Sequence, residues 1–154
     1  MDLKARINKD LIAALKSRDN LKTETLRFLL ASIHNREIEK RSKADAADLT
    51  DEEIYDVLNR EAKKRKEAAQ IYEKGGRPEL AEKELKELEI IKEYLPAELS
   101  EEEVRKIAAE AVAKTGAKNE KDFGKVMGEA MKQLKGKADS SVVSRIIKEF
   151  LVEK

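Results

Sequence analysis

Apolar side chains recur along this chain with the three- and four-residue spacing that is typical of amphipathic helices. Near the start of the chain they occupy every fourth position, at Leu3, Ile7, Leu11 and Leu15. This spacing predicts a first helix over about residues 2–18. A second apolar face, from Leu26 to Ile33, predicts a second helix with Asn20 as its cap. Residues 42–49 are mostly small and polar, which predicts a loop.

Capping residues and helix breakers mark the next two helices. Thr50 followed three residues later by Glu53 has the form of a capping box, which predicts a helix start. That helix is expected to end at Gly75-Gly76, because glycine adopts the left-handed conformation of a helix end at little cost. Pro78 suits the first position of a fourth helix, where its missing N–H would have no partner in any case. This fourth helix is predicted to bury four apolar side chains: Ala81, Leu85, Leu88 and Ile91.

A proline divides the chain into two parts. The residue before a proline is pushed out of the helical region, so Tyr94-Leu95-Pro96 must end the fourth helix. We therefore predict an all-α fold, with an N-terminal domain of about four helices over residues 1–95. Residues 96–154 are predicted to form a C-terminal three-helix bundle.

Three further capping residues define the helices of this second part. Ser100 forms a second capping box with Glu103, and it opens a helix that Gly116 ends. Asn119 is the predicted cap of a helix over about residues 120–135. Asp139 is the predicted cap of the last helix.

The composition excludes several classes of protein. Charged residues make up 42% of the chain and aromatic residues 4%, and there is no cysteine. A disulfide scaffold, a thiolate zinc site and a cysteine nucleophile are therefore excluded. No apolar stretch approaches the roughly 20 residues that a membrane-spanning helix needs. Because the first residues also lack the apolar segment of a signal peptide, we expect a cytoplasmic protein with no membrane contact.

Catalytic chemistry has little support in the sequence. Neither a glycine-rich phosphate loop nor a Gly-x-Ser-x-Gly motif is present. His34 is the single histidine, which excludes a histidine-pair metal site and a Ser-His-Asp arrangement. The carboxylate clusters lie in first helical turns, where they stabilise the helix dipole. We therefore predict no catalytic residue, no cofactor and no metal, and leave open whether the protein has any enzymatic activity.

The distribution of charge is more informative than its total of +1. The first 95 residues contain 21 basic and 21 acidic side chains, whereas the segment from Lys114 to Lys148 contains nine basic and four acidic ones. At about 100° per residue, Lys121, Lys125, Lys132 and Lys135 share a sector of about 80° on the predicted sixth helix. The apolar side chains of this helix lie on the opposite face.

Two glycines, Gly124 and Gly128, lie beside or among these lysines. Glycine within a helix costs about 0.5–1 kcal/mol relative to alanine, so a close approach by a neighbouring helix or by a ligand backbone is the expected reason. Two interpretations of this lysine face remain possible: it is simply solvated, or it binds an anionic partner. For the second reading, the candidate RNA-binding residues are Lys121, Lys125, Gly128, Lys132, Lys135, Gly136 and Lys137. We expect such a surface to read phosphates and shape rather than base sequence.

A second basic cluster lies on the third helix, from Arg60 to Lys66. Its side chains point around the whole helix, so as a binding surface it is weaker than the lysine face. A Glu61–Arg65 pair, four residues apart at the edge of the apolar side, is the simplest explanation for part of it.

Several motifs resemble a known family. The stretch Asp122-Phe123-Gly124-Lys125-Val126-Met127-Gly128, then Met131 and Gly136-Lys137-Ala138, is similar to the GatB/YqeY domain. That domain is the C-terminal tail of the B subunit of tRNA-dependent Asp/Glu amidotransferase. Tyr94-Leu95-Pro96, Leu99-Ser100-Glu101-Glu102, the length and the helix order resemble the stand-alone YqeY family over the whole chain. Asp139-Ser140 departs from the Asn-Pro of the amidotransferase tail.

The resemblance implies an all-helical fold and a role in holding tRNA, because the amidotransferase tail helps to hold tRNA while other regions do the chemistry. It supplies no active site. We therefore expect a non-catalytic tRNA- or RNA-binding accessory module, with tRNA, another RNA or an amidotransferase as partner. A helical protein-interaction adaptor is the alternative. An accessory part in glutamine-dependent carbon–nitrogen ligase activity is a more distant one.

Overall fold

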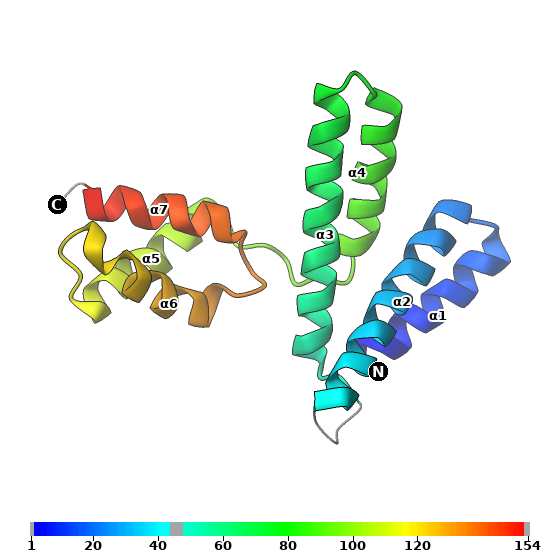
Figure 1. Cartoon of the computed structure of the whole chain (residues 1–154), viewed down its shortest axis with the longest axis horizontal. Coiled ribbons are helices and arrows are strands. Elements are labelled where there is room, and N and C mark those ends of the chain that lie inside the picture. Colours follow the sequence, from blue (N-terminus) through cyan, green and yellow to red (C-terminus); the bar gives the residue numbers. More distant parts are fainter. Residues whose placement is uncertain (1, 44–47, 153–154) are drawn as a thin grey trace. The chain divides into compact units, whose positions relative to one another are not determined.

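The computed structural model describes residues 2–43 and 48–152. Within these residues the chain forms seven α-helices and one short 3₁₀-helix, and no strand (Figure 1). The predicted all-α class is therefore confirmed. The chain divides into two compact units, Met1–Leu95 and Pro96–Lys154.

The first unit contains four helices: α1 (Leu3–Ser17), α2 (Asn20–Lys43), α3 (Asp51–Lys74) and α4 (Pro78–Lys92). Figure 1 shows α1 with α2 and α3 with α4 as two antiparallel hairpins. The hairpins share a core whose most deeply buried side chains are Ile7, Leu26, Leu29, Ile33, Leu58 and Ile91. Burial of these side chains provides the main driving force for folding of this unit.

In the first unit the helix starts follow the predicted caps, with one exception. The Thr50 hydroxyl accepts a hydrogen bond from the Glu53 N–H at 3.2 Å, and the Glu53 carboxylate accepts one from the Thr50 N–H at 2.8 Å, so this capping box is confirmed. The cap of α2 is Asp19 rather than Asn20, because the Asp19 carboxylate accepts the Lys22 N–H at 3.1 Å. Of the predicted loop 42–49, residues 42 and 43 belong to α2, and residues 44–47 lie outside the described residues.

Leu85 is not buried as predicted, because 41% of its surface is exposed. The buried side of α4 contains Ala81, Leu88 and Ile91. At about 100° per residue, Leu85 lies roughly 60° from Leu88 and roughly 120° from Ile91, beyond the edge of this narrow face.

Tyr94 anchors the end of the first unit directly before the proline break. Its side chain is buried, and its hydroxyl donates to the Asp10 carboxylate of α1 at 2.6 Å. The Arg6 guanidinium covers the ring at 4.9 Å and donates to the Glu93 carbonyl at 3.2 Å. Burial, together with the Asp10 hydrogen bond, raises the pKa of Tyr94, so the hydroxyl remains protonated and keeps donating.

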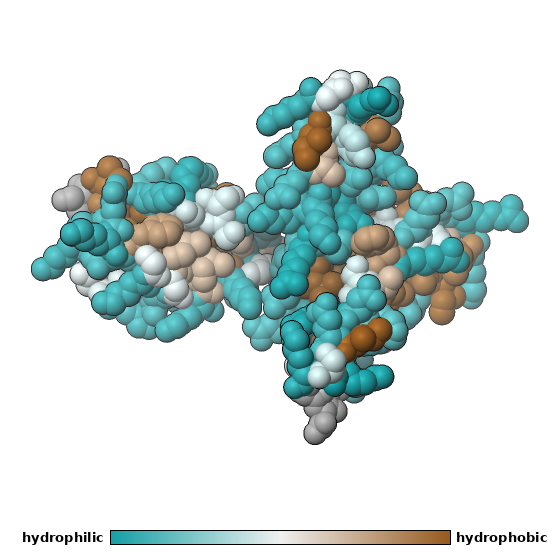
Figure 2. Space-filling model, viewed as in Figure 1, coloured by the Kyte–Doolittle hydropathy of each residue, from teal (hydrophilic) through white to brown (hydrophobic). Residues whose placement is uncertain are grey.

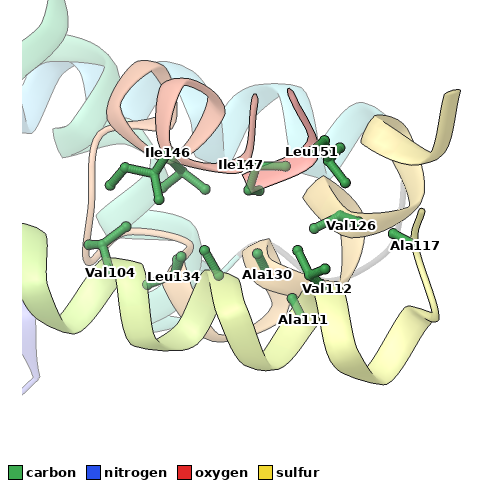
Figure 3. Close-up of a cluster of buried hydrophobic side chains, with 12 residues drawn as sticks. Val104, Ala111, Val112, Ala117, Val126, Ala130, Leu134, Ile146, Ile147 and Leu151 are labelled. Atoms are coloured by element: carbon green, nitrogen blue, oxygen red, sulfur yellow. The ribbon is translucent and has the colours of Figure 1, made fainter. Parts of the chain in front are cut away.

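The second unit contains α5 (Glu101–Thr115), the 3₁₀-helix η1 (Glu120–Asp122), α6 (Phe123–Leu134) and α7 (Ser140–Val152). The second capping box is confirmed, since Ser100 and Glu103 exchange the two expected hydrogen bonds. Side chains of α5, α6 and α7 point toward one another to form the core, including Val104, Leu134 and Ile146 (Figure 3). Across the described residues, no helix combines the length and apolar character that crossing a membrane requires.

Candidate anion-binding surface

Helix α6 is amphipathic, and its polar face is the candidate site. Val126, Ala130 and Leu134 are completely buried against α5 and α7. Lys125 and Lys132 lie on the opposite, exposed side. The buried side chains therefore hold the exposed face in a defined orientation on the second unit.

The predicted sixth helix, residues 120–135, is shorter than expected. Residues 120–122 form η1, because the Asn119 side chain accepts the Lys121 N–H and the Asp122 carboxylate accepts the Lys118 N–H, both at 3.0 Å. Lys135 follows the helix in a turn, with a backbone conformation outside the helical region. A single helical wheel therefore does not describe all four predicted lysines, and only Lys125 and Lys132 lie on α6 itself.

The segment after α6 is held in place by backbone contacts. Gly136 has a φ of +78°, a left-handed conformation that favours glycine. The carbonyl of Lys137 accepts the Leu99 N–H at 2.8 Å, which ties this turn to the segment before α5. The Asp139 carboxylate accepts the Ser141 N–H at 2.9 Å, as expected for the cap of α7. The side chain of Lys137 is thus presented on an ordered turn.

Gly124 and Gly128 face open space. No heavy atom that could restrict a side chain lies within 4 Å of the position a Cβ atom would take at either glycine. Both residues are exposed. Of the two predicted reasons for these glycines, close packing of a neighbouring helix of the second unit is therefore wrong, and approach by a ligand backbone stays a prediction.

The predicted lysines differ in their ionic partners. Lys132 Nζ lies 3.0 Å from a carboxylate oxygen of Glu129, whose other oxygen lies 2.8 Å from Lys114 Nζ on α5. Lys135 also has a partner. Within the described part of the chain, the ammonium groups of Lys121, Lys125 and Lys137 form no ion pair or hydrogen bond. These three lysines are the available cations of the predicted set.

Glu129 is the acidic residue of helix α6. The hydrogen bonds from Lys114 and then Lys132 hold the pKa of Glu129 below its usual value, and Glu129 raises the pKa of Lys114. A carboxyl group whose pKa is lowered on folding stabilises the fold at neutral pH, and this contribution disappears as the pH falls through that lowered pKa. The bridge between α5 and α6 is therefore intact at neutral pH and opens in acid.

Two features of this surface were not predicted. Lys114 joins it through Glu129, although Lys114 had been counted only in the overall charge of the segment. Phe123 is partly exposed, and the Lys148 ammonium lies 5.5 Å from the centre of its ring. Neither feature has a local sequence signal, because each joins residues from different helices.

The basic cluster on α3 contains a structural ion pair, as predicted. Arg65 Nη1 bonds to the Glu61 carboxylate, and both side chains are buried. Arg65 Nε lies 3.5 Å from a Glu87 carboxylate oxygen on α4, and its guanidinium lies 4.6 Å from the centre of the Phe28 ring on α2. Arg65 therefore links three helices of the first unit and is not available to a partner.

These observations define an all-helical protein with a polar helix face of exposed lysines and glycines on its C-terminal unit. The family described as Yqey-like protein matches residues 4–151, nearly the whole chain. The chain belongs to the YqeY family.

Curated relatives include proteins named altered inheritance of mitochondria protein 41, mitochondrial. The relative from Lachancea thermotolerans is 36% identical over 95 residues, which cover 62% of this chain and 49% of the relative. The relative from Eremothecium gossypii is 33% identical over 96 residues, 62% of this chain and 50% of the relative. The relative from Pyrenophora tritici-repentis is 28% identical over 150 residues, 95% of this chain and 79% of the relative. The chain thus spans about half the length of the first two.

The names of these relatives contradict the cytoplasmic location predicted from the sequence, because they place the relatives in mitochondria. That prediction rested on the lack of a long apolar stretch and on the polar start of the chain. A charged helical protein without cysteine suits any aqueous compartment, so its composition does not distinguish one from another.

Proposed function

We propose that this protein is a non-catalytic RNA-binding module that holds tRNA or another structured RNA against the exposed face of α6. The observation that carries this proposal is the combination of available lysines with open glycines. Among the described residues, Lys121, Lys125 and Lys137 have no ionic partner. Gly124 and Gly128 leave room for a backbone beside the first two of these lysines. Lysine ammonium groups bind phosphates as point charges, and this binding needs no base-specific contact.

The proposal to bind tRNA in particular rests on the resemblance to the amidotransferase tail, which helps to hold tRNA. The match of Gly124, Gly128, Met131 and Gly136 covers the same segment as the lysines. An amidotransferase is therefore a second candidate partner. If the protein takes part in carbon–nitrogen ligation, the purified chain should release ammonia from glutamine.

The test is the binding of a labelled tRNA transcript to the full-length protein, followed by fluorescence anisotropy at increasing salt. Three lysine–phosphate contacts predict that log K falls with log salt with a slope of about −3. Two tRNAs of different sequence should bind about equally. Absence of binding at low salt, or binding that salt does not weaken, would contradict the proposal.

A Gly128→Ala substitution should separate binding from stability. The free energy of unfolding should rise by about 0.5–1 kcal/mol, because alanine favours the helix and the added methyl group meets no neighbouring side chain or helix among the described residues. The tRNA affinity should fall, because the methyl group occupies the space proposed for the RNA backbone. Urea denaturation and anisotropy measure the two effects.

The exposed Gln133, also on α6, supplies the control for Gly128→Ala. A Gln133→Ala substitution should leave tRNA binding unchanged. If Gly128→Ala is more stable and binds tRNA as well as the wild type, the glycine face does not contact RNA.

A protein-interaction adaptor is the second candidate function. The first unit contains seven of the large apolar side chains found exposed in the described residues: Ile12, Leu15, Phe28, Ile38, Ile71, Leu80 and Leu85. On the face that Figure 2 shows, hydrophobic side chains interrupt a mostly hydrophilic surface. A protein complex formed there would survive nuclease and high salt, which an RNA-mediated one would not.

We also infer that the two units are separate folding domains of four and three helices. Each has its own buried cluster, within residues 3–94 and 104–151 respectively. A substitution that destabilises one unit should therefore leave the hydrogen-exchange protection of the backbone amides in the other unit unchanged. Variants of Arg65 in the first unit test this expectation.

A further inference from the structure

Glu129 divides the lysines of the candidate surface into two groups. Among the described residues, Lys121, Lys125 and Lys137 have no ionic partner, whereas Lys114 and Lys132 share the Glu129 carboxylate at 2.8 and 3.0 Å. These two lysines come from different helices, α5 and α6. A single negative charge thus offsets part of the positive charge of two cations.

Burial differs between the carboxylate and its lysines. The Glu129 side chain is 16% exposed, whereas those of Lys114 and Lys132 are 73% and 72% exposed. The ammonium groups are therefore accessible to a phosphate, and the carboxylate remains beside them. When a phosphate binds, each lysine must either break its ion pair with Glu129 or interact with Glu129 and the phosphate at the same time.

We propose that Glu129 is a built-in counter-ion that lowers the affinity of the α6 surface for RNA phosphates, and that Lys114 of α5 belongs to this surface. This inference rests on the proposed RNA-binding function. A competing carboxylate weakens the attraction of its lysines for a second anion, because the two anions repel each other at close range. The surface therefore binds phosphate less tightly than its number of lysines implies.

The opposite role would be that Glu129 positions the two lysines for RNA. In that case its removal would weaken binding. The high exposure of both lysine side chains favours competition, because a side chain in contact mainly with solvent is poorly fixed by one ion pair. The two roles predict changes of opposite sign.

The experiment compares full-length wild type with Glu129→Gln, using the labelled tRNA transcript. Glutamine keeps the size of the side chain and removes its charge. The substitution should tighten binding about three- to tenfold at low salt and make the salt slope more negative by about 1 to 2, because two further lysines become available. Adding Lys114→Gln to this variant should reverse about half of the change in slope. Circular dichroism checks that each variant is folded.

Glu110→Gln supplies the matched control. Glu110 is exposed on α5, one turn before Lys114, and forms no ion pair within the described residues. Its substitution makes the same change in net charge and frees no lysine, so the salt slope should not change. Equal effects of the two substitutions, unchanged binding in Glu129→Gln, or weaker binding in that variant would overturn the proposal.

Heparin, as a second ligand, allows the role of Glu129 to be tested even if the proposed RNA-binding function is wrong. If wild type does not bind tRNA, the RNA-binding function fails. The same variants are then eluted from heparin, a polyanion that needs no RNA-specific contact. Elution of Glu129→Gln at higher salt than both wild type and Glu110→Gln supports the counter-ion role, and elution together with them overturns it.

Discussion

Reversing the charge of Lys121 and Lys125 to glutamate should abolish tRNA binding by the full-length protein and leave its fold intact. Both side chains are exposed and have no ionic partner within the described residues, so their loss breaks no internal contact. The double substitution removes two phosphate contacts and adds two repulsive charges. At about 1 kcal/mol for each unit of charge near a phosphate, affinity should fall on the order of 100- to 1000-fold at low salt.

The matched control for this variant is the charge reversal of Lys9 and Lys63 in the first unit. Both are exposed, form no ion pair within the described residues, and give the same change in net charge. Lys63 also represents the basic cluster on α3. Binding should fall by less than about threefold in this control, as expected for screened charges away from the site. Equal losses in both variants would show that net charge alone governs binding.

Replacing Arg65 with methionine should destabilise the first unit by about 3–5 kcal/mol, because the buried Glu61 carboxylate loses its buried guanidinium partner. Glu61 then keeps only the exposed Lys64 as an ionic partner, with its Nζ at 3.2 Å. Glu61 is 4% exposed, and Arg65 Nε also lies 3.5 Å from a carboxylate oxygen of Glu87. The stacking of the guanidinium on Phe28 is lost as well. Burial and the neighbouring Glu87 already raise the pKa of Glu84, while Arg65 lowers it, so removal of Arg65 should raise this pKa further.

A double substitution distinguishes the stability lost by removing the whole Glu61–Arg65 pair from the stability lost by leaving Glu61 without Arg65. Glu61→Leu together with Arg65→Met should recover much of the stability that Arg65→Met loses, because no unpaired charge remains from the pair. Arg60→Met is the control, since Arg60 is exposed on the same helix, and its effect should lie within about 0.5 kcal/mol.

Urea denaturation measures these stabilities, and amide hydrogen exchange locates the change. A loss below about 1 kcal/mol in Arg65→Met would show that the pair is effectively solvated. Protection in residues 96–152 should be unaffected. Its loss in parallel with the first unit would contradict the proposal of two folding domains.

Helix positions were the most predictable part of this structure. Thr50 and Ser100 cap helices through hydrogen bonds to residues three positions later, so four consecutive residues contain the whole signal. Where neighbouring residues compete for this role, the sequence was less informative. Asp19 and Asn20 are both good caps, and only the observed hydrogen bond identified Asp19.

The candidate site was predictable in its position but not in its properties. The lysines of the α6 segment were found from charge and spacing, and the uninterrupted helix expected over residues 120–135 was wrong at both ends. The local hydrogen bonds of Asn119 and Asp122 produce a 3₁₀ turn there, which a 100° spacing does not reveal. The openness of the surface at Gly128 also depends on where α5 and α7 pack, and spacing within α6 contains no information on this.

The order of residues along the chain was enough to predict that this protein is helical, where most of its helices begin, and that its positive charge concentrates in the last third. Caps, helix breakers and apolar spacing act over one or two turns, so neighbouring residues contain this information. Which lysines are available to a partner depends on how the helices pack. Glu129 reaches Lys114 across fifteen positions of sequence, because α5 and α6 pack together in the second unit. Ion pairs between helices depend on packing, and packing depends on the whole unit.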